Sequence, residues 1–121
     1  MARYIISDYV NGRPVKSVHQ NMTLEQKLHA MSKFYFPVMG VYKNSEEKSY
    51  IIYDLSEEQA LGLVRAFNQE CAAVLSKYRA FGLLWAEGNY ESLGQWTTST
   101  EKPDCDSYTY NPANGLYLFV K

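Results

Sequence analysis

Four side chains in this sequence are of the types that serve as nucleophiles, bases or soft metal ligands: His19, His29, Cys71 and Cys105. Nucleophilic catalysis needs a thiol or hydroxyl beside a base, and no local signature pairs an imidazole with a cysteine here. A zinc site needs four clustered ligands, and the chain lacks both Cys-x-x-Cys and His-x₃₋₅-His spacing. We therefore predict no catalytic residue and no metal site.

Carboxylates occur in pairs at Glu46-Glu47 and Glu57-Glu58, a pattern that general acid–base catalysis can use. The first pair falls in an expected hairpin loop and the second in the first turn of an expected helix, so neither pair requires a catalytic role. No glycine-rich phosphate-binding motif is present. We predict that the protein has no cofactor.

Tyrosine accounts for eleven of the aromatic residues, and its combination of contact area and a polar tip is typical of interfaces. The second half of the chain is rich in such residues, from which we predict a partner-binding surface formed by Tyr90, Trp96, Tyr108 and Tyr110. The alternative is that these rings only cover a thin sheet.

Length and composition limit the class of protein. The 121 residues predict a single α+β domain over residues 1–121, and a hydrophobic content of 46% excludes general disorder. The net charge of −1 argues against a duplex nucleic-acid partner. No window approaches the roughly 20 apolar residues of a membrane span, and Asp8 interrupts any signal peptide. With only two cysteines, we expect a cytoplasmic protein, in the host cytoplasm if a phage encodes it.

Turn and capping signals predict the first elements. Asn11-Gly12 predicts a hairpin between strands at Tyr4 to Val10 and Pro14 to Val18. Thr23 and Ser56, each followed three residues later by Gln, form capping boxes that begin helices ending near Lys33 and near Glu70.

The remaining segments predict strands. Two of them, 38–42 and 49–53, are joined by an exposed loop over 43–48, and four more are expected at 73–77, 81–86, 92–99 and 116–120. Residues 101–113 read as a long irregular loop. The order predicts an α+β two-layer sandwich, with a mostly antiparallel sheet of about six to seven strands and two helices on one face.

The middle of the chain carries a second kind of signal. Asn21, Pro37-Val38 with Gly40 and Tyr42, the run 47–52 and the run 67–70 lie in a characteristic order. Over roughly Asn21 to Leu84 the chain resembles a family of small bacterial and phage domains of uncharacterised function. The resemblance implies a fold and no reaction.

In that family pattern an acid lies two places before a small residue that opens a strand, and a Gln lies near the end of the following helix. Here these positions correspond to Glu47, Ser49 and Gln69. With Asn21 they form a candidate polar pocket. The alternative is that Ser49 and Gln69 only satisfy backbone groups at a sheet edge and a helix end.

From these observations we favour a non-enzymatic protein-binding module, a phage accessory protein that inhibits or redirects a host protein. The runner-up is a small nucleotide- or base-binding domain or enzyme, with a pocket around Glu47, Ser49 and Gln69 to which His29 contributes. A third hypothesis is binding of single-stranded nucleic acid. Exposed strand edges are also compatible with a homodimer.

Overall fold

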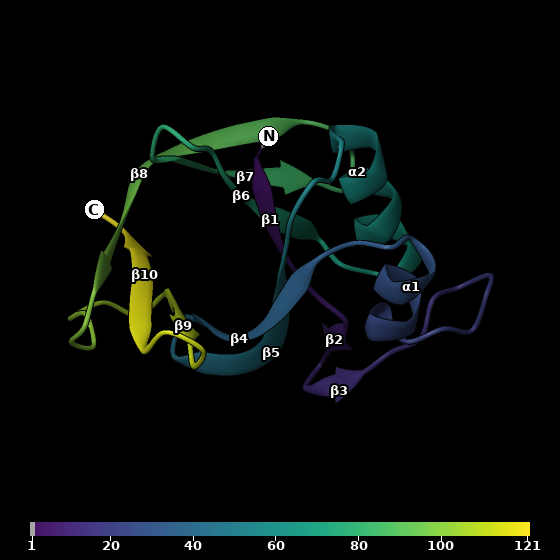
Figure 1. Ribbon diagram of the computed structural model, residues 1–121, viewed down its shortest axis with the longest axis horizontal. Helices are drawn as coiled ribbons and strands as arrows, with labels where there is room; N and C mark the ends of the chain where they lie inside the picture. The colour runs from purple at the N-terminus through teal and green to yellow at the C-terminus, as the bar shows by residue number, and fades with distance from the viewer. Residues whose placement is uncertain (1) are drawn as a thin grey trace.

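A closed β-barrel organises the chain in this computed structural model, which describes residues 2–121. Figure 1 looks along the barrel, with both helices outside it on one side. Eight strands close it in the order β1-β5-β4-β9-β10-β8-β7-β6, and every neighbouring pair is antiparallel. The strands are β1 (Arg3–Ser7), β4 (Tyr35–Tyr42), β5 (Ser45–Ile52), β6 (Cys71–Leu75), β7 (Ala80–Trp85), β8 (Tyr90–Ser99), β9 (Tyr108–Asn111) and β10 (Leu116–Val120).

The prediction of an open α+β two-layer sandwich is therefore wrong. Residues 101–113, expected as a loop, contain strand β9, which pairs with β4 on one side and with β10 on the other. At the opposite side of the barrel, β1 bonds to both β5 and β6. These pairings join the N-terminal and C-terminal halves of the sheet, so the barrel has no edge.

The predicted turn and caps are confirmed, and one predicted loop is wrong. Strands β2 (Tyr9–Val10) and β3 (Arg13–Pro14) pair through Asn11-Gly12, both with positive φ. Helices α1 (Leu24–Ala30) and α2 (Glu57–Ala66) both begin with a complete capping box. The 43–48 loop is instead a tight turn at Lys43-Asn44, again with positive φ, so residues 45–48 belong to β5.

Two apolar clusters lie on the two faces of the barrel wall. The outer cluster places Tyr4, Ile6, Tyr50 and Ile52 against α1 and α2. The inner cluster contains Ile5, Val38, Ile51 and Leu75, with partly buried side chains from β7, β8 and β10. Because side chains alternate along a strand, each residue of β1 and β5 is assigned to one face. Neither helix is long and apolar enough to cross a membrane within residues 2–121.

The closure of the barrel yields a stability prediction. Thr109 lies in the middle of β9 between Gly40 and Leu118, and proline at this position removes a ladder donor from a strand bonded on both sides. We expect Thr109→Pro to lower the free energy of unfolding by about 1–3 kcal/mol relative to Thr109→Ala, which keeps the N–H. Urea denaturation measures this difference, and equal stabilities of the two variants would show that β9 does not close the barrel.

Candidate functional site

Polar residues gather where β1 ends and β5 begins. Ser7 and Ser49 face each other across these strands, and both are buried. The Ser7 hydroxyl donates to the carbonyl of Lys48 at 2.9 Å and accepts from the Tyr9 N–H at 2.9 Å. This pair of bonds fixes the path of the chain as it leaves the barrel.

Glu47 and Ser49 lie on the inner face of the barrel wall, because they alternate with Lys48 and share their face with Ile51. Gly40 pairs with Glu47 on the neighbouring strand. A side chain at Gly40 would lie 3.2 Å from the Ser49 hydroxyl and 3.4 Å from the Glu47 carbonyl. Glycine therefore lets the Ser49 hydroxyl and the Glu47 carbonyl approach the β4 backbone closely, and Glu47 is half-buried.

The Glu47 carboxylate has no side-chain hydrogen-bond donor within residues 2–121. Within residues 2–121, the carboxylates that accept hydrogen bonds from other side chains belong to Glu25, Glu91 and Asp106. Glu47 is not one of them. Its neighbour Lys48 lies on the opposite face, where its ammonium is 5.6 Å from the centre of the Tyr50 ring.

The third residue of the predicted pocket, Gln69, lies at the same end of the barrel. Its amide donates to the carbonyl of Tyr9 at 3.0 Å and to that of Phe67 at 3.1 Å. Gln69 therefore bonds to Tyr9, two residues after Ser7, which is the strand partner of Ser49. Asn21 lies elsewhere, in an exposed turn before α1, where its N–H donates to Ser17.

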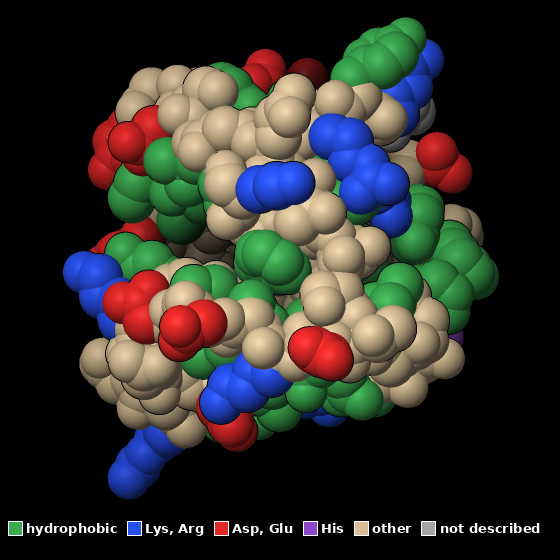
Figure 2. All heavy atoms as spheres, turned by 90° about the vertical axis from the view of Figure 1, so that its left-hand side faces the viewer, with side chains coloured by type: hydrophobic (Ala, Val, Ile, Leu, Met, Phe, Trp, Pro, Cys, Tyr) green, Lys and Arg blue, Asp and Glu red, His purple; other side chains and the backbone are tan. Residues whose placement is uncertain are grey.

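The four aromatic residues predicted to bind a partner do not form one surface. Tyr108 and Tyr110 alternate with inward-facing residues and pack against Tyr117 outside the barrel, whereas Trp96 belongs to the inner cluster and donates to the Ser76 carbonyl. Tyr90 is exposed and covers Gly82. On the side that carries β8 and β10, hydrophobic side chains occur in separate groups among charged and polar ones (Figure 2).

A cluster that the sequence did not predict lies on the outer face of the barrel wall, around β4 and β5. We call Asp8, Glu25, Tyr35 and Tyr50 the acidic–tyrosine cluster. The Tyr50 and Tyr35 hydroxyls donate to the two oxygens of Glu25 at 3.3 and 3.1 Å. Tyr35 also lies 2.8 Å from Nε2 of His29, which must donate when the single Tyr35 proton goes to Glu25. Side chains alternate between the two faces of β5, so the sequence could have placed Tyr50 on the face opposite to that of Ser49.

Burial and nearby negative charges keep the Tyr50 hydroxyl of this cluster protonated. Burial, then the charges of Glu25 and Asp8, raise the pKa of Tyr50, so its hydroxyl remains a donor at neutral pH. Burial also raises the pKa of Asp8, although a backbone N–H of Leu24 and the charge of Lys48 act in the opposite direction. Asp8 is thus a buried acid that favours its proton more than an exposed aspartate does.

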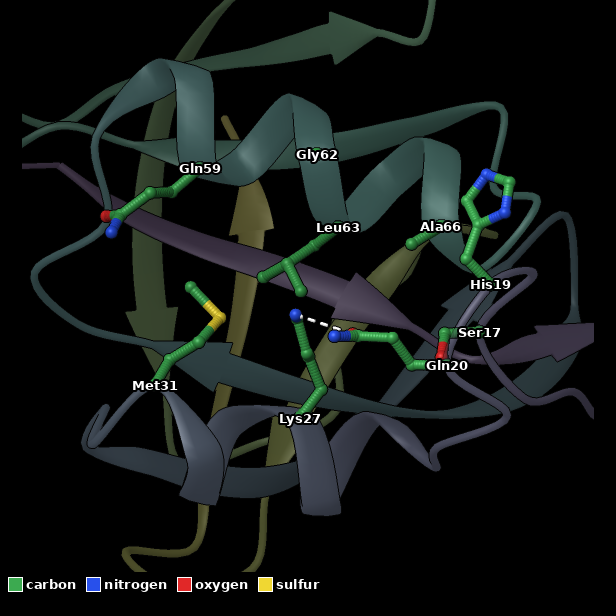
Figure 3. Close-up of a pocket in the computed structure, with 9 residues that line it drawn as sticks. All are labelled: Ser17, His19, Gln20, Lys27, Met31, Gln59, Gly62, Leu63 and Ala66. Carbon is green, nitrogen blue, oxygen red and sulfur yellow. Dashed lines mark hydrogen bonds between the residues drawn. The ribbon is translucent and has the colours of Figure 1, made fainter.

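A groove lies between helices α1 and α2 (Figure 3). It encloses about 420 Å³, and Met31 and Leu63 point toward each other across it. Lys27 donates to Gln20 at 2.7 Å at its rim. Lys27 and His19 line the groove, and no carboxylate is among the residues that line it.

The thiols and imidazoles do not form a nucleophilic site. His19 lines the groove and His29 contacts Tyr35, while the Cys105 thiol donates to the Ser107 carbonyl. Burial, then the charges of Glu70 and Glu91, raise the pKa of Cys71 to about 11. Residues 2–121 contain no group of three or more His, Cys, Asp or Glu side chains arranged to hold a metal.

The raised pKa of Asp8 predicts a pH-dependent stability. The native state binds this proton more tightly than the unfolded chain, so the contribution of Asp8 to stability falls as the pH rises above about 4. We expect Asp8→Asn to gain stability relative to the unmodified chain between about pH 4 and pH 7. Urea unfolding at both pH values tests this, with the exposed Asp104→Asn as control. A gain that is the same at both pH values would contradict it.

The two cysteines should differ in reactivity. At about pH 8 only about one thousandth of Cys71 is thiolate, and its side chain is more than half covered, whereas Cys105 is exposed. A chromogenic disulfide reagent should therefore react quickly with one thiol and with the second only after denaturation. Cys105→Ser should remove the fast phase. A fast phase that persists in this variant would mean that Cys71 is accessible.

Comparison with known proteins identifies the chain's relatives. A family model described as the S-adenosylmethionine lyase family matches residues 10–121, which is all but the first nine residues. A search of curated proteins found no match.

This match corrects the predicted function. The family is described by an enzyme activity, so the prediction of a non-enzymatic protein-binding module, and of a phage inhibitor of a host protein, is wrong. The alternative, a small enzyme acting on a nucleotide-like molecule, agrees better with the family. The resemblance over roughly Asn21 to Leu84 falls within the matched region, and the match does not show a phage family or one of uncharacterised function. The chain belongs to the S-adenosylmethionine lyase family.

Proposed function

We propose that this protein cleaves S-adenosylmethionine at a carbon–sulfur bond without adding water. The observation that carries the proposal is the family match over residues 10–121, which includes Glu47, Ser49 and Gln69. The proposal agrees with the runner-up hypothesis from the sequence, which was a small nucleotide- or base-binding domain or enzyme with a polar pocket around these residues.

The chemistry of the substrate explains why such an enzyme needs no nucleophilic residue. Sulfur in S-adenosylmethionine is a sulfonium cation, so the bonding electrons pass to sulfur and a neutral thioether leaves without an acid. When the aminobutyryl carbon–sulfur bond breaks, two reactions balance in atoms and electrons without adding water. Either the carboxylate of the substrate forms a new carbon–oxygen bond and closes a lactone, or a base removes a neighbouring proton and an alkene forms. In both routes 5′-methylthioadenosine is the thioether.

The substrate carries two cations, and a carboxylate of the protein has different effects on each. The sulfonium loses its charge in the transition state, so a carboxylate beside it would stabilise the ground state more and slow the reaction. The α-ammonium keeps its charge throughout. We therefore assign Glu47 to the α-ammonium. Its half-buried position and its lack of a side-chain donor within residues 2–121 support this assignment.

The activity is tested with purified protein and S-adenosylmethionine, followed by mass spectrometry of the products. We expect 5′-methylthioadenosine together with a lactone or an unsaturated amino acid, which precedes any homoserine. Intact substrate after long incubation would contradict the proposal, and homoserine as the first product would indicate a hydrolase instead.

The role of Glu47 is tested by Glu47→Gln. Loss of a charged partner for the ammonium should raise KM about tenfold or more and change kcat much less, because the contact is the same in both states. Glu46→Gln is the matched control, since Glu46 is the preceding residue of β5, exposed and on the other face. Equal KM values for the two variants would place the ammonium elsewhere, and a loss confined to kcat would make Glu47 a base.

A further inference from the structure

The interior of the barrel is not completely filled. A cavity of about 240 Å³ lies inside it, and neither Glu47 nor Ser49 is among the residues that line it. Ile5, Val38, Ile51 and Leu118 supply apolar walls. Thr98, Thr109 and Asn111 add hydroxyl and amide groups. The cavity therefore combines apolar walls with a comparable share of polar groups, a mixture that suits a small molecule with one charged end.

Two arginines and a tryptophan border the cavity. The Arg79 guanidinium lies 4.4 Å from the centre of the Trp96 ring, and that of Arg3 lies 5.2 Å from it. Arg3 is also 5.9 Å from the Tyr53 ring. The main chain holds this arrangement in place, because the Trp96 N–H donates to the Arg79 carbonyl at 2.8 Å and the indole N–H donates to Ser76.

The two guanidiniums keep their donors available. Within residues 2–121, the guanidinium that donates a hydrogen bond is that of Arg65, to the carbonyl of Ala86. Stacking on an indole uses the face of a guanidinium and leaves its N–H groups at the edge. No aspartate or glutamate lines the cavity. Two positive charges thus meet at one cavity without an acidic partner.

We propose that this cavity is a second ligand site, which binds a small organic acid. The carboxylate pairs with Arg3 and Arg79 beside Trp96, and the apolar part of the acid lies against Ile5 and Leu118 inside the barrel. A planar carboxylate matches the donor geometry of a guanidinium. Neither Glu47 nor Ser49 lines this cavity, so the acid and the ammonium that we assign to Glu47 would contact different residues.

The test uses the fluorescence of Trp96 with butyrate as the probe. The Trp85→Phe background leaves Trp96 as the single tryptophan. Butyrate has about six non-hydrogen atoms, for which a Kd of about 1 mM is a reasonable efficiency. Butyramide has the same shape without the charge and is the matched ligand control. Arg79→Gln and Arg3→Gln test the two cations, and Lys77→Gln is the control, because Lys77 is exposed on the same hairpin and does not line the cavity.

We expect a saturable change with butyrate and none with butyramide. Each arginine variant should raise the Kd at least about tenfold, which is the loss of one charged hydrogen-bonded contact, and Lys77→Gln should leave it unchanged. The proposal is overturned if butyrate gives no saturation up to about 20 mM, if butyramide binds equally well, or if both arginine variants fold and keep the original Kd. Circular dichroism establishes that each variant is folded.

Discussion

Strand β9 closes the barrel, and this closure determines which side chains face the interior. β9 bonds to β4 and to β10, which come from opposite halves of the chain, and so removes both exposed edges. Once the sheet is closed, alternation decides which side chains enter the interior. Glu47 and Ser49 then face inward near one end of β5, while Trp96 and Arg3 border a separate cavity. The acidic–tyrosine cluster lies outside the same wall, under α1.

The chemistry of a sulfonium explains why a search for catalytic motifs pointed to the wrong class of protein. Nucleophile–histidine pairs and metal sites serve reactions in which the leaving group is poor or water must be activated. A thioether leaves from a sulfonium as a neutral molecule, so the protein has to bind and orient the substrate and to exclude water. Such a site needs only carboxylates, amides and aromatic rings, which are common in any small domain. The absence of familiar machinery therefore carries no information about this activity.

Local elements could be predicted from the sequence, and their closure could not. The Asn11-Gly12 turn and both capping boxes depend on residues next to each other, and all are found. β9 is a short strand within a polar segment that contains Pro103 and Pro112, and only its partners in β4 and β10 identify it. Gln69 and Ser49 were grouped from a family resemblance; Gln69 bonds to the Tyr9 carbonyl and Ser49 pairs with Ser7, and the pocket that would join them stays a prediction. The acidic–tyrosine cluster was missed because Asp8 and Glu25 meet Tyr50 only after α1 packs on the sheet.

Chemical-shift mapping locates the substrate on the protein. The ligand is an unreactive analogue of S-adenosylmethionine in which carbon replaces the sulfonium and the α-ammonium is kept, added to ¹⁵N-labelled protein. We expect the largest amide shifts at Gly40, Glu47 and Ser49, because Gly40 pairs with Glu47 and lies beside the Ser49 hydroxyl. Shifts confined to Lys27, Gly62 and Ala66, in the groove between the helices, would contradict it.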